Sequence, residues 1–218
     1  REALIAGEPE AINAVLDAAR GTAGEFLASA LLLRAQKRAI YMPTNQGHYA
    51  LGAQAYCHFT SPIRRYPDEL VHRALKALLA GTLGSKEQEQ IAGQLPQLCA
   101  TCSQMERAAD GAARTSQRIK MAELYADHVG EAFSGVVCGC ERFGLFVMLD
   151  ETCAEGLLPA RALGGEWLEY DEDRMTLTGE ESGRVWGMGT RVRVVVTETD
   201  IPRGRIDFAL ADPRDAAR

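Results

Sequence analysis

The sequence predicts an α+β chain, in which a helical N-terminal half is followed by a small closed β-barrel. In residues 1–126, several segments carry apolar side chains at helical spacing. Near Asp127 the pattern changes to an alternation of β-branched and aromatic residues, with glycines at the turns. The chain has 218 residues, of which 46% are hydrophobic, so it can form one large or two small domains with a buried core.

Two helices are expected within residues 1–38. The segment PEAINAVLDAAR begins at Pro9, which suits the first turn of a helix, and it ends at Gly21. The segment GEFLASALLLRAQKRAI follows, again with helical spacing of its apolar residues. The next stretch, YMPTNQGHYALGAQAYCHFTSP, is rich in turn residues and predicts a loop with short extended structure.

Two further helices complete the N-terminal half. The first ends near Ala80, where GTLGS follows, and a long second helix covers about Glu87 to Ala126. The long helix contains Gly111 and a kink is expected at Pro96, because proline removes a backbone donor. The first of these helices has one apolar face, made of Leu70, Val71, Ala74, Leu75, Leu78 and Leu79.

The C-terminal half predicts a run of short strands. The segment EAFSGVVCGCERFGLFVMLDETCAEGLLP alternates as strands do, and RVRVVVTETDIPRGRIDFAL reads as a hairpin with IPRG as its turn. Five such strands are typical of a small closed barrel such as the OB fold. Between them lies GGEWLEYDEDRMTLTGEESGR, which is acidic and poorly periodic and predicts a solvated loop.

Charge and hydropathy limit the function classes. The net charge of −6 and pI near 5.3 argue against a protein coated in positive charge for duplex nucleic acid, although a local basic channel remains compatible with them. No apolar run reaches membrane-spanning length, and no signal-peptide pattern opens the chain. We therefore expect a cytoplasmic, monomeric protein without a membrane partner. Since the chain begins at Arg1 without a methionine, we expect a piece of a longer or processed polypeptide.

The cysteines predict reduced thiols rather than a disulfide framework. They are spread irregularly through segments that are expected to be helix or core strand. A zinc site built from CATC and CGC is the alternative, but isolated motifs of this kind are weak signals. The six residues are Cys57, Cys99, Cys102, Cys138, Cys140 and Cys153.

The segment SPIRRYPD contains the strongest local signal for binding. Pro62 and Pro67 restrict the backbone on either side of Arg64 and Arg65, so the two arginines are presented in a stiff geometry at a helix entrance. A guanidinium that is already in place loses less entropy when it binds an anion. The pattern therefore indicates an anion-binding turn.

Four segments, in order, resemble the RNase II/RNase R exoribonucleases of the RNB family. HFTSPIRRYPDELVHRALKALL is similar to the family's signature segment, AIYMPTNQGHYALGAQAY to the stretch before it, and CSQMERAADGAART to a later helix. Residues 130–211 resemble the S1-type OB barrel that follows the catalytic domain, through ERFGLFVML, EGLLPARAL and RIDFAL. The resemblance covers residues 24–211 and is greatest to the RNase R branch.

This resemblance implies processive hydrolysis of single-stranded RNA from its 3′ end to 5′-mononucleotides. It also implies attack by a metal-activated water, with two Mg²⁺ ions roughly 4 Å apart. The family holds these ions on clustered aspartates early in its catalytic domain, and this chain has no such cluster. We therefore expect no metal ligands in this chain, a metal site upstream, and the missing N-terminal part of the catalytic domain as a partner.

The resemblance also assigns residues in the helical half. Arg64 matches the family's catalytic arginine, and Arg65 matches its neighbour, for which phosphate contact and a salt bridge to Asp68 or Glu69 are equal alternatives. Glu106 matches a helix glutamate near the terminal nucleotide; the alternative is an exposed ladder of charges. For RNA contact we also name His48, in a loop, and Tyr66, which can stack on a base or pack beside a proline.

In the barrel, Phe143 and Phe146 are expected to stack on bases, and Arg205 to contact phosphate. The alternative is that one phenylalanine belongs to the core, since strand alternation puts the two on opposite faces unless Gly144 bulges. Arg142 and Arg161 can also reach phosphates. The family often has histidine where this chain has Pro159, so the barrel's RNA contacts are expected to be weaker or different.

The sequence therefore predicts part of an RNB exoribonuclease that binds single-stranded RNA. We expect the C-terminal part of the catalytic domain at 1–126, the S1 barrel at 127–212 and a tail at 213–218. One alternative is a non-catalytic single-stranded RNA-binding module. Without the family resemblance, a helical adaptor carrying a small barrel is the other.

Overall fold

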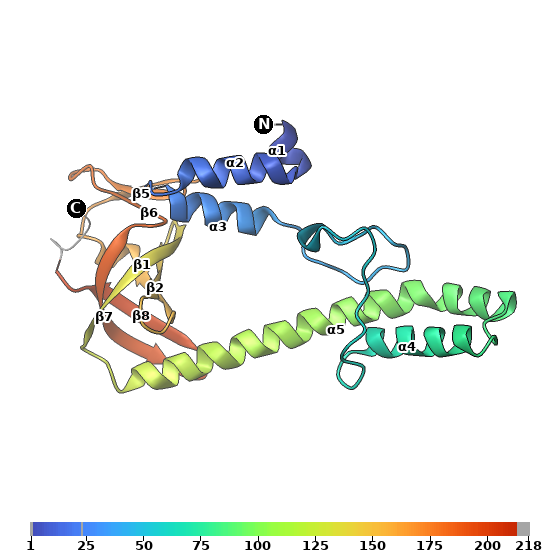
Figure 1. The fold of residues 1–218 in the computed structure, drawn as a ribbon. Coiled ribbons are helices and arrows are strands. Elements are labelled where there is room, and N and C mark those ends of the chain that lie inside the picture. Colours follow the sequence, from blue (N-terminus) through green and yellow to red (C-terminus); the bar gives the residue numbers. More distant parts are fainter. Residues whose placement is uncertain (1, 23, 213–218) are drawn as a thin grey trace. The chain divides into compact units, whose positions relative to one another are not determined.

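The computed structural model describes residues 2–22 and 24–212, so the expected tail at 213–218 lies outside the described residues. The chain divides into two compact units (Figure 1). One unit contains residues 37–113, and the other combines the residues up to 36 with those from 114 onward. Among the described helices, none is both long and apolar enough to cross a membrane.

The unit that holds the barrel begins with α1 (Glu2–Ala6), α2 (Pro9–Ala19) and α3 (Glu25–Ala35). The two expected helices are present, and α1 is an additional one-turn helix before them. Pro9 occupies the first turn of α2, where its missing N–H leaves no hydrogen bond unmade. The guanidinium of Arg34 donates to the carbonyl of Cys138 at 3.1 Å, which ties α3 to the first barrel strand.

The other unit contains η1 (Tyr49–Leu51), α4 (Tyr66–Leu79) and the first part of α5 (Ser85–Ala126). Both long helices occur where the apolar periodicity predicted them. Helix α4 has Pro67 in its first turn and is followed by Gly81 at φ +68°, a conformation that favours glycine. Helix α5 continues as one element through Pro96 and Gly111.

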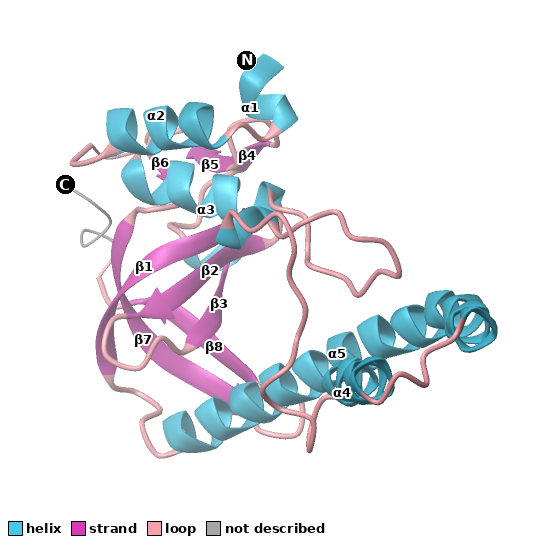
Figure 2. Ribbon diagram, turned by 45° about the vertical axis from the view of Figure 1, so that its right-hand side comes forward, coloured by secondary structure: helices cyan, strands magenta, loops and turns pink. Residues whose placement is uncertain are grey.

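Five strands close into the expected barrel (Figure 2). Its strand order is β1-β2-β3-β8-β7, antiparallel except for the β3–β8 pair. Inward side chains such as Leu145, Val147 and Phe208 are almost completely buried and alternate with outward ones, as a half-buried strand requires. The strands are β1 (Ala132–Glu141), β2 (Gly144–Leu149), β3 (Glu155–Pro159), β7 (Arg191–Asp200) and β8 (Arg205–Leu210), and η2 (Ala160–Ala162) follows β3.

The prediction of a solvated loop between these strands is wrong. The acidic segment contains β4 (Leu168–Asp171) and β5 (Thr176–Gly179), which form a second sheet with β6 (Val185–Gly187) directly after the segment, and this sheet packs beside β1. Two apolar residues, Leu177 and Trp186, are fully buried and anchor it, while most of the acidic side chains remain exposed. Leu168, Tyr170 and Met175 are only partly buried against the same core, so the periodic signal of this sheet in the sequence is weak.

A local hydrogen-bond cluster holds the end of this second sheet. The carboxylate of Glu166 accepts hydrogen bonds from the N–H groups of Glu181 and Ser182 and from the Ser182 hydroxyl, at 2.6–2.9 Å. These bonds hold the pKa of Glu166 below its ordinary value, because they favour the charged form. One acidic residue of the segment therefore has a structural role.

The turn between β7 and β8 rests directly on helix α5. Gly204 has φ +59°, and a Cβ atom there would come within 2.9 Å of the backbone at Arg118 and Ile119. No side chain fits in this space without moving the helix or the turn. Gly204 therefore allows the close approach of α5 to the hairpin that carries Arg205.

We expect Gly204→Ala to destabilise the barrel unit by about 1–3 kcal/mol, the usual cost of overpacking, in addition to the cost of a left-handed conformation. Gly183→Ala is the matched control, because Gly183 has φ +64° but open space around its Cβ position. Chemical denaturation of both variants measures the difference. Equal destabilisation would show that backbone strain alone matters and that the contact with α5 does not.

Candidate nucleic-acid interface

The SPIRR segment forms the constrained turn that its prolines predict. The carbonyl of Ser61 accepts hydrogen bonds from the N–H groups of Arg64, at 3.2 Å, and Arg65, at 3.0 Å. This double acceptance closes the turn immediately before α4. The side chain of Arg64 is exposed and makes no hydrogen bond or ion pair with the described residues. The turn therefore presents one uncompensated guanidinium to solvent.

The neighbouring Arg65 is held by a buried carboxylate. Its Nη2 lies 2.8 Å from Oδ1 of Asp68, whose side chain is 0% exposed, while that of Arg65 is 23% exposed. The same Oδ1 accepts the backbone N–H of Ser61 at 2.7 Å. The salt bridge that the sequence offered as one alternative for Arg65 is thus present, and it goes to Asp68. Glu69 pairs with Arg73 on the surface of α4 instead.

The pKa of Asp68 reflects these contacts. Burial alone would raise it, but the Ser61 N–H, the Arg65 guanidinium and the nearby His58 hold it below its ordinary value. Asp68 Oδ2 and Arg65 Nε are both buried and lack a hydrogen-bond partner among the described residues. Asp68 is therefore held through Oδ1 alone, and loss of either charged partner would leave the other poorly compensated.

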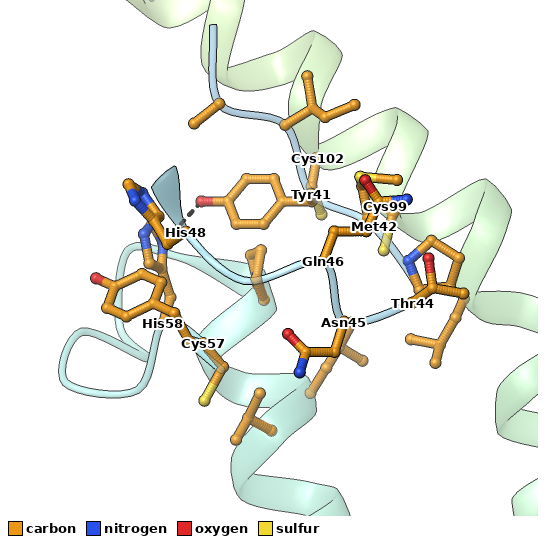
Figure 3. A pocket seen from close by; sticks show the side chains of 18 of the residues that line it. Tyr41, Met42, Thr44, Asn45, Gln46, His48, Cys57, His58, Cys99 and Cys102 are labelled. Atoms are coloured by element: carbon orange, nitrogen blue, oxygen red, sulfur yellow. Dashed lines mark hydrogen bonds between the residues drawn. The ribbon is translucent and has the colours of Figure 1, made fainter. Parts of the chain in front are cut away.

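A cavity of about 700 Å³ lies within the same unit (Figure 3). Its walls come from residues 39–48 and 55–58, from the start of α4 and from the middle of α5. Tyr41 fixes one wall, because its N–H donates to Ser103 Oγ on α5 and its hydroxyl lies 2.9 Å from Nδ1 of His58. Burial and the nearby Glu106 carboxylate raise the pKa of Tyr41.

Two of the predicted site residues line this cavity. Glu106 lines it from α5, close enough to affect Tyr41. His48 lines it from the loop, forms an isolated bridge with Ala53 and meets the ring of Tyr56 edge-on at 5.0 Å. Its Nδ1 is buried without a hydrogen-bond partner in the described part of the chain. Arg64 and Tyr66 do not line the cavity; Tyr66 is exposed at the start of α4.

Three of the six free thiols also line the cavity, namely Cys57, Cys99 and Cys102 (Figure 3). Burial raises the pKa of Cys99 and Cys102. Cys138 and Cys140 belong to the other unit, and burial raises the pKa of each to about 11. Within residues 2–22 and 24–212, no group of three or more histidine, cysteine or acidic side chains fits a metal ion. The thiols of CATC and CGC therefore form no such group among the described residues.

On the barrel, Phe143 and Phe146 form one aromatic surface. Their rings meet edge to face with centroids 6.0 Å apart, and Phe143 is 57% exposed. Phe146 points outward from β2 between the buried Leu145 and Val147, so neither phenylalanine belongs to the core. The alternative prediction, that one of the two phenylalanines belongs to the core, is therefore wrong.

Gly144 makes this arrangement possible. It has φ +153°, and a Cβ there would lie 2.5 Å from the carbonyl oxygen of Leu158 and 2.8 Å from Cα of Pro159. The turn before β2 can therefore lie close to β3, which leaves Phe143 beside Phe146 on the outer face. Opposite Phe146 on β1 lies Gly139, over which the phenyl ring packs.

Arg205 lies on the same outer surface of the barrel. It alternates along β8 with the buried Ile206, and its Nη2 is 3.3 Å from Oδ2 of Asp207. Asp207 on β8 lies opposite Leu157 on the neighbouring strand β3, and Leu157 in turn lies opposite Phe146 on β2. The strand pairing thus connects the aromatic surface to the Arg205–Asp207 ion pair. Arg142 and Arg161 are exposed.

Sequence reasoning missed several residues that shape these sites. It named Asp68 only as a possible partner of Arg65, although an acidic residue in the first turn of a helix is a recognisable signal. It did not name Tyr41, His58 or Ser103, whose contacts join segments up to 62 residues apart. No local pattern reports such contacts.

The comparisons with known proteins agree with this architecture. The RNB domain family matches residues 3–81, and the S1 RNA binding domain family matches residues 126–211. Ribonuclease R of Escherichia coli K12 is 36% identical over 218 residues, 97% of this chain and 27% of the relative. Ribonuclease R of Thermotoga maritima is 41% identical over 184 residues, 84% of this chain and 26% of the relative. The chain thus spans about a quarter of the length of these relatives.

Two solved structures of Mycoplasma genitalium RNase R are also similar. The apo form has a TM-score of 0.81 at 26% identity, covering 89% of this chain and 31% of that one. The complex with ribose-methylated single-stranded RNA has a TM-score of 0.80 at 26% identity, with the same coverage. Both the helical part and the barrel of this chain therefore have counterparts of known structure.

Proposed function

Because this chain belongs to the RNB family and carries an S1 domain, we propose that it is part of a hydrolytic exoribonuclease. The enzyme degrades single-stranded RNA processively from the 3′ end and releases 5′-mononucleotides. The observation that carries this proposal is the turn at Arg64, which presents an uncompensated guanidinium while Asp68 neutralises the adjacent Arg65. Relatives named ribonuclease R, and a similar RNase R structure that contains single-stranded RNA, support it.

Arg64 is the catalytic residue in this proposal. Hydrolysis of a phosphodiester increases negative charge on the non-bridging oxygens in the transition state, and a fixed guanidinium can donate two hydrogen bonds to them. The closed turn supplies the fixed geometry. Glu106, which lines the cavity in the same unit, accepts a hydrogen bond from a ribose hydroxyl of the terminal nucleotide or orients a water.

The S1 barrel holds the RNA. Phe143 and Phe146 provide a stacking surface that accepts any base. Arg205 contacts phosphate, although Asp207 partly neutralises its charge. Tyr66 and His48 add contacts from the other unit, whereas Arg65, named from the sequence as a phosphate contact or a salt-bridge partner, is occupied by its salt bridge to Asp68. The division into a catalytic part at 1–126 and a barrel at 127–212 belongs to the same proposal, as do the cytoplasmic location and the monomeric state.

In this proposal the carboxylates that hold the Mg²⁺ ions implied by the resemblance belong to another part of the catalytic domain, since this chain spans about a quarter of the length of its relatives. Exposed apolar side chains support a missing partner: Leu75, Leu78 and Leu79 on α4, all predicted to form its apolar face, are open to solvent. The rest of the catalytic domain is the partner we assign to them.

A non-catalytic RNA-binding module is the second candidate. The aromatic surface of the barrel favours it, since such a surface can bind RNA without hydrolysing it. The carboxylates of the remaining catalytic domain decide between the two candidates.

We expect the chain by itself to bind single-stranded RNA without degrading it. A labelled oligoribonucleotide incubated with the chain and Mg²⁺ should stay intact. The logarithm of the binding constant should fall linearly with the logarithm of the salt concentration, with a slope of about −0.7 for each phosphate contacted. Fluorescence anisotropy at several salt concentrations and gel analysis of the products measure both. Release of mononucleotides would place the whole active site in this chain, and a flat salt response would contradict phosphate contacts.

Phe143→Ala and Phe146→Ala should each weaken binding by about 1–3 kcal/mol, because each removes a stacking ring. Neither residue is in the core, so the melting temperature should change little for Phe143→Ala. Trp167→Ala is the control, since Trp167 is an exposed aromatic residue directly before β4 of the second sheet. Normal RNA affinity in both phenylalanine variants would rule out the stacking surface.

In the intact enzyme, Arg64→Ala should reduce the single-turnover rate by about 10²-fold or more, with a much smaller change in RNA affinity. Arg64→Lys should restore little, because an ammonium group cannot make the planar two-pronged contact. Arg73→Ala, at another exposed arginine of the same unit, is the control. Equal losses of rate and affinity, or full activity with lysine, would make Arg64 a general phosphate anchor.

A further inference from the structure

We propose that Asp68 is the positioning residue for Arg64, an assignment that rests on the proposed function. Its carboxylate is buried against the turn that presents Arg64, so it does not lie on the solvent-exposed surface. In this assignment Asp68 neither touches RNA nor reacts. It fixes the direction of the arginine that does.

The first argument is the geometry of the clamp, which we define as the contacts of the Asp68 carboxylate with the Ser61 N–H and the Arg65 guanidinium. Asp68 lies in the first turn of α4, where an acidic side chain ordinarily caps the backbone N–H at the start of its own helix. Here the carboxylate reaches back seven residues and accepts the N–H of Ser61. The carbonyl of Ser61 accepts the N–H groups of Arg64 and Arg65. Ser61 is thus held on both sides, and the backbone at Arg64 cannot rotate without breaking one of these bonds.

The division of roles between the two arginines is the second argument. Both are basic and adjacent, but Arg65 turns inward and compensates the buried Asp68, while Arg64 turns outward and stays unpaired with the described residues. If Asp68 were neutral, Arg65 would lose its internal anion and compete with Arg64 for the same phosphate. The buried carboxylate therefore also selects which guanidinium faces the RNA.

The incomplete pairing is the third argument. Asp68 Oδ2 and Arg65 Nε are buried without partners among the described residues, so the clamp depends on a single oxygen that receives two donors. An asparagine at this position keeps the shape of the side chain but loses the charge that holds both donors on one atom. Even a small displacement of a catalytic group can be expensive, since about 1 Å can reduce a rate 10²-fold.

The test uses the intact enzyme that contains this chain, with Asp68→Asn, Arg64→Ala and the double variant. Asp68→Asn should lower kcat about tenfold or more and leave KM within about twofold, because ground-state RNA binding does not depend on the direction of Arg64. In the Arg64→Ala background, Asp68→Asn should change kcat less than about twofold. Glu69→Gln, which removes the exposed pair with Arg73 one residue further along the helix, should have wild-type kinetics.

The outcomes separate this assignment from the proposed function. A wild-type enzyme that releases no mononucleotides would overturn the proposed function and the assignment with it. An active wild-type enzyme with an unaffected Asp68→Asn variant would overturn the assignment alone. Full additivity of the two substitutions would also overturn it, because a general loss of structure does not act through Arg64.

Arg65→Met provides a second variant if Asp68→Asn does not fold, as thermal melting will reveal. The substitution removes the opposite charge of the buried Asp68 carboxylate and so breaks the same clamp, and the melting temperature of the variant reports how much stability is lost. We expect a lower kcat that is again non-additive with Arg64→Ala, with the RNA affinity and its salt dependence unchanged. A weaker affinity with a smaller salt slope would identify Arg65 as a phosphate contact and overturn the clamp.

Discussion

The carboxylate of Asp68 joins three parts of one unit, and the organisation of the Arg64 turn depends on it. Asp68 lies in the first turn of α4. Its carboxylate accepts the backbone N–H of Ser61 from the turn and pairs with the guanidinium of Arg65. Burying a carboxylate is unfavourable unless donors and an opposite charge surround it. Here the turn and the helix are folded so as to provide them. The same contacts that stabilise the charge also determine where Arg64 points.

The outer face of the barrel is also shaped by only a few residues. The inward side chains of the barrel are mostly apolar and almost completely buried, so the RNA contacts that we propose for it lie on the outer face. Two glycines shape that face. Gly144 lets the turn before β2 approach β3, and Gly139 leaves space for the ring of Phe146. An aromatic pair that strand alternation alone would split between two faces is thereby gathered on one.

Much of this fold follows from periodicity, and the failures have identifiable physical causes. Helices α4 and α5 and the five barrel strands have repeated apolar positions, so their pattern could be recognised. The second sheet could not, because Leu177 is the one fully buried apolar residue within the acidic segment and Trp186 lies just after it, while Leu168, Tyr170 and Met175 are only partly buried. Likewise Arg64 and Glu106 were reached through motifs, whereas the contact between Tyr41 and Ser103 joins distant segments and leaves no local trace.

The acidic net charge of the chain is compatible with an RNA-binding role once the pairing of charges is considered. Arg65, Arg73 and Arg191 each lie against a carboxylate, so they contribute little to the field that an approaching phosphate meets. Arg64 has no such partner among the described residues. At physiological ionic strength, exposed charges further apart than about 8 Å are largely screened from one another. A phosphate at the turn therefore interacts chiefly with Arg64, and the sum of charges over the rest of the surface has little influence on that contact.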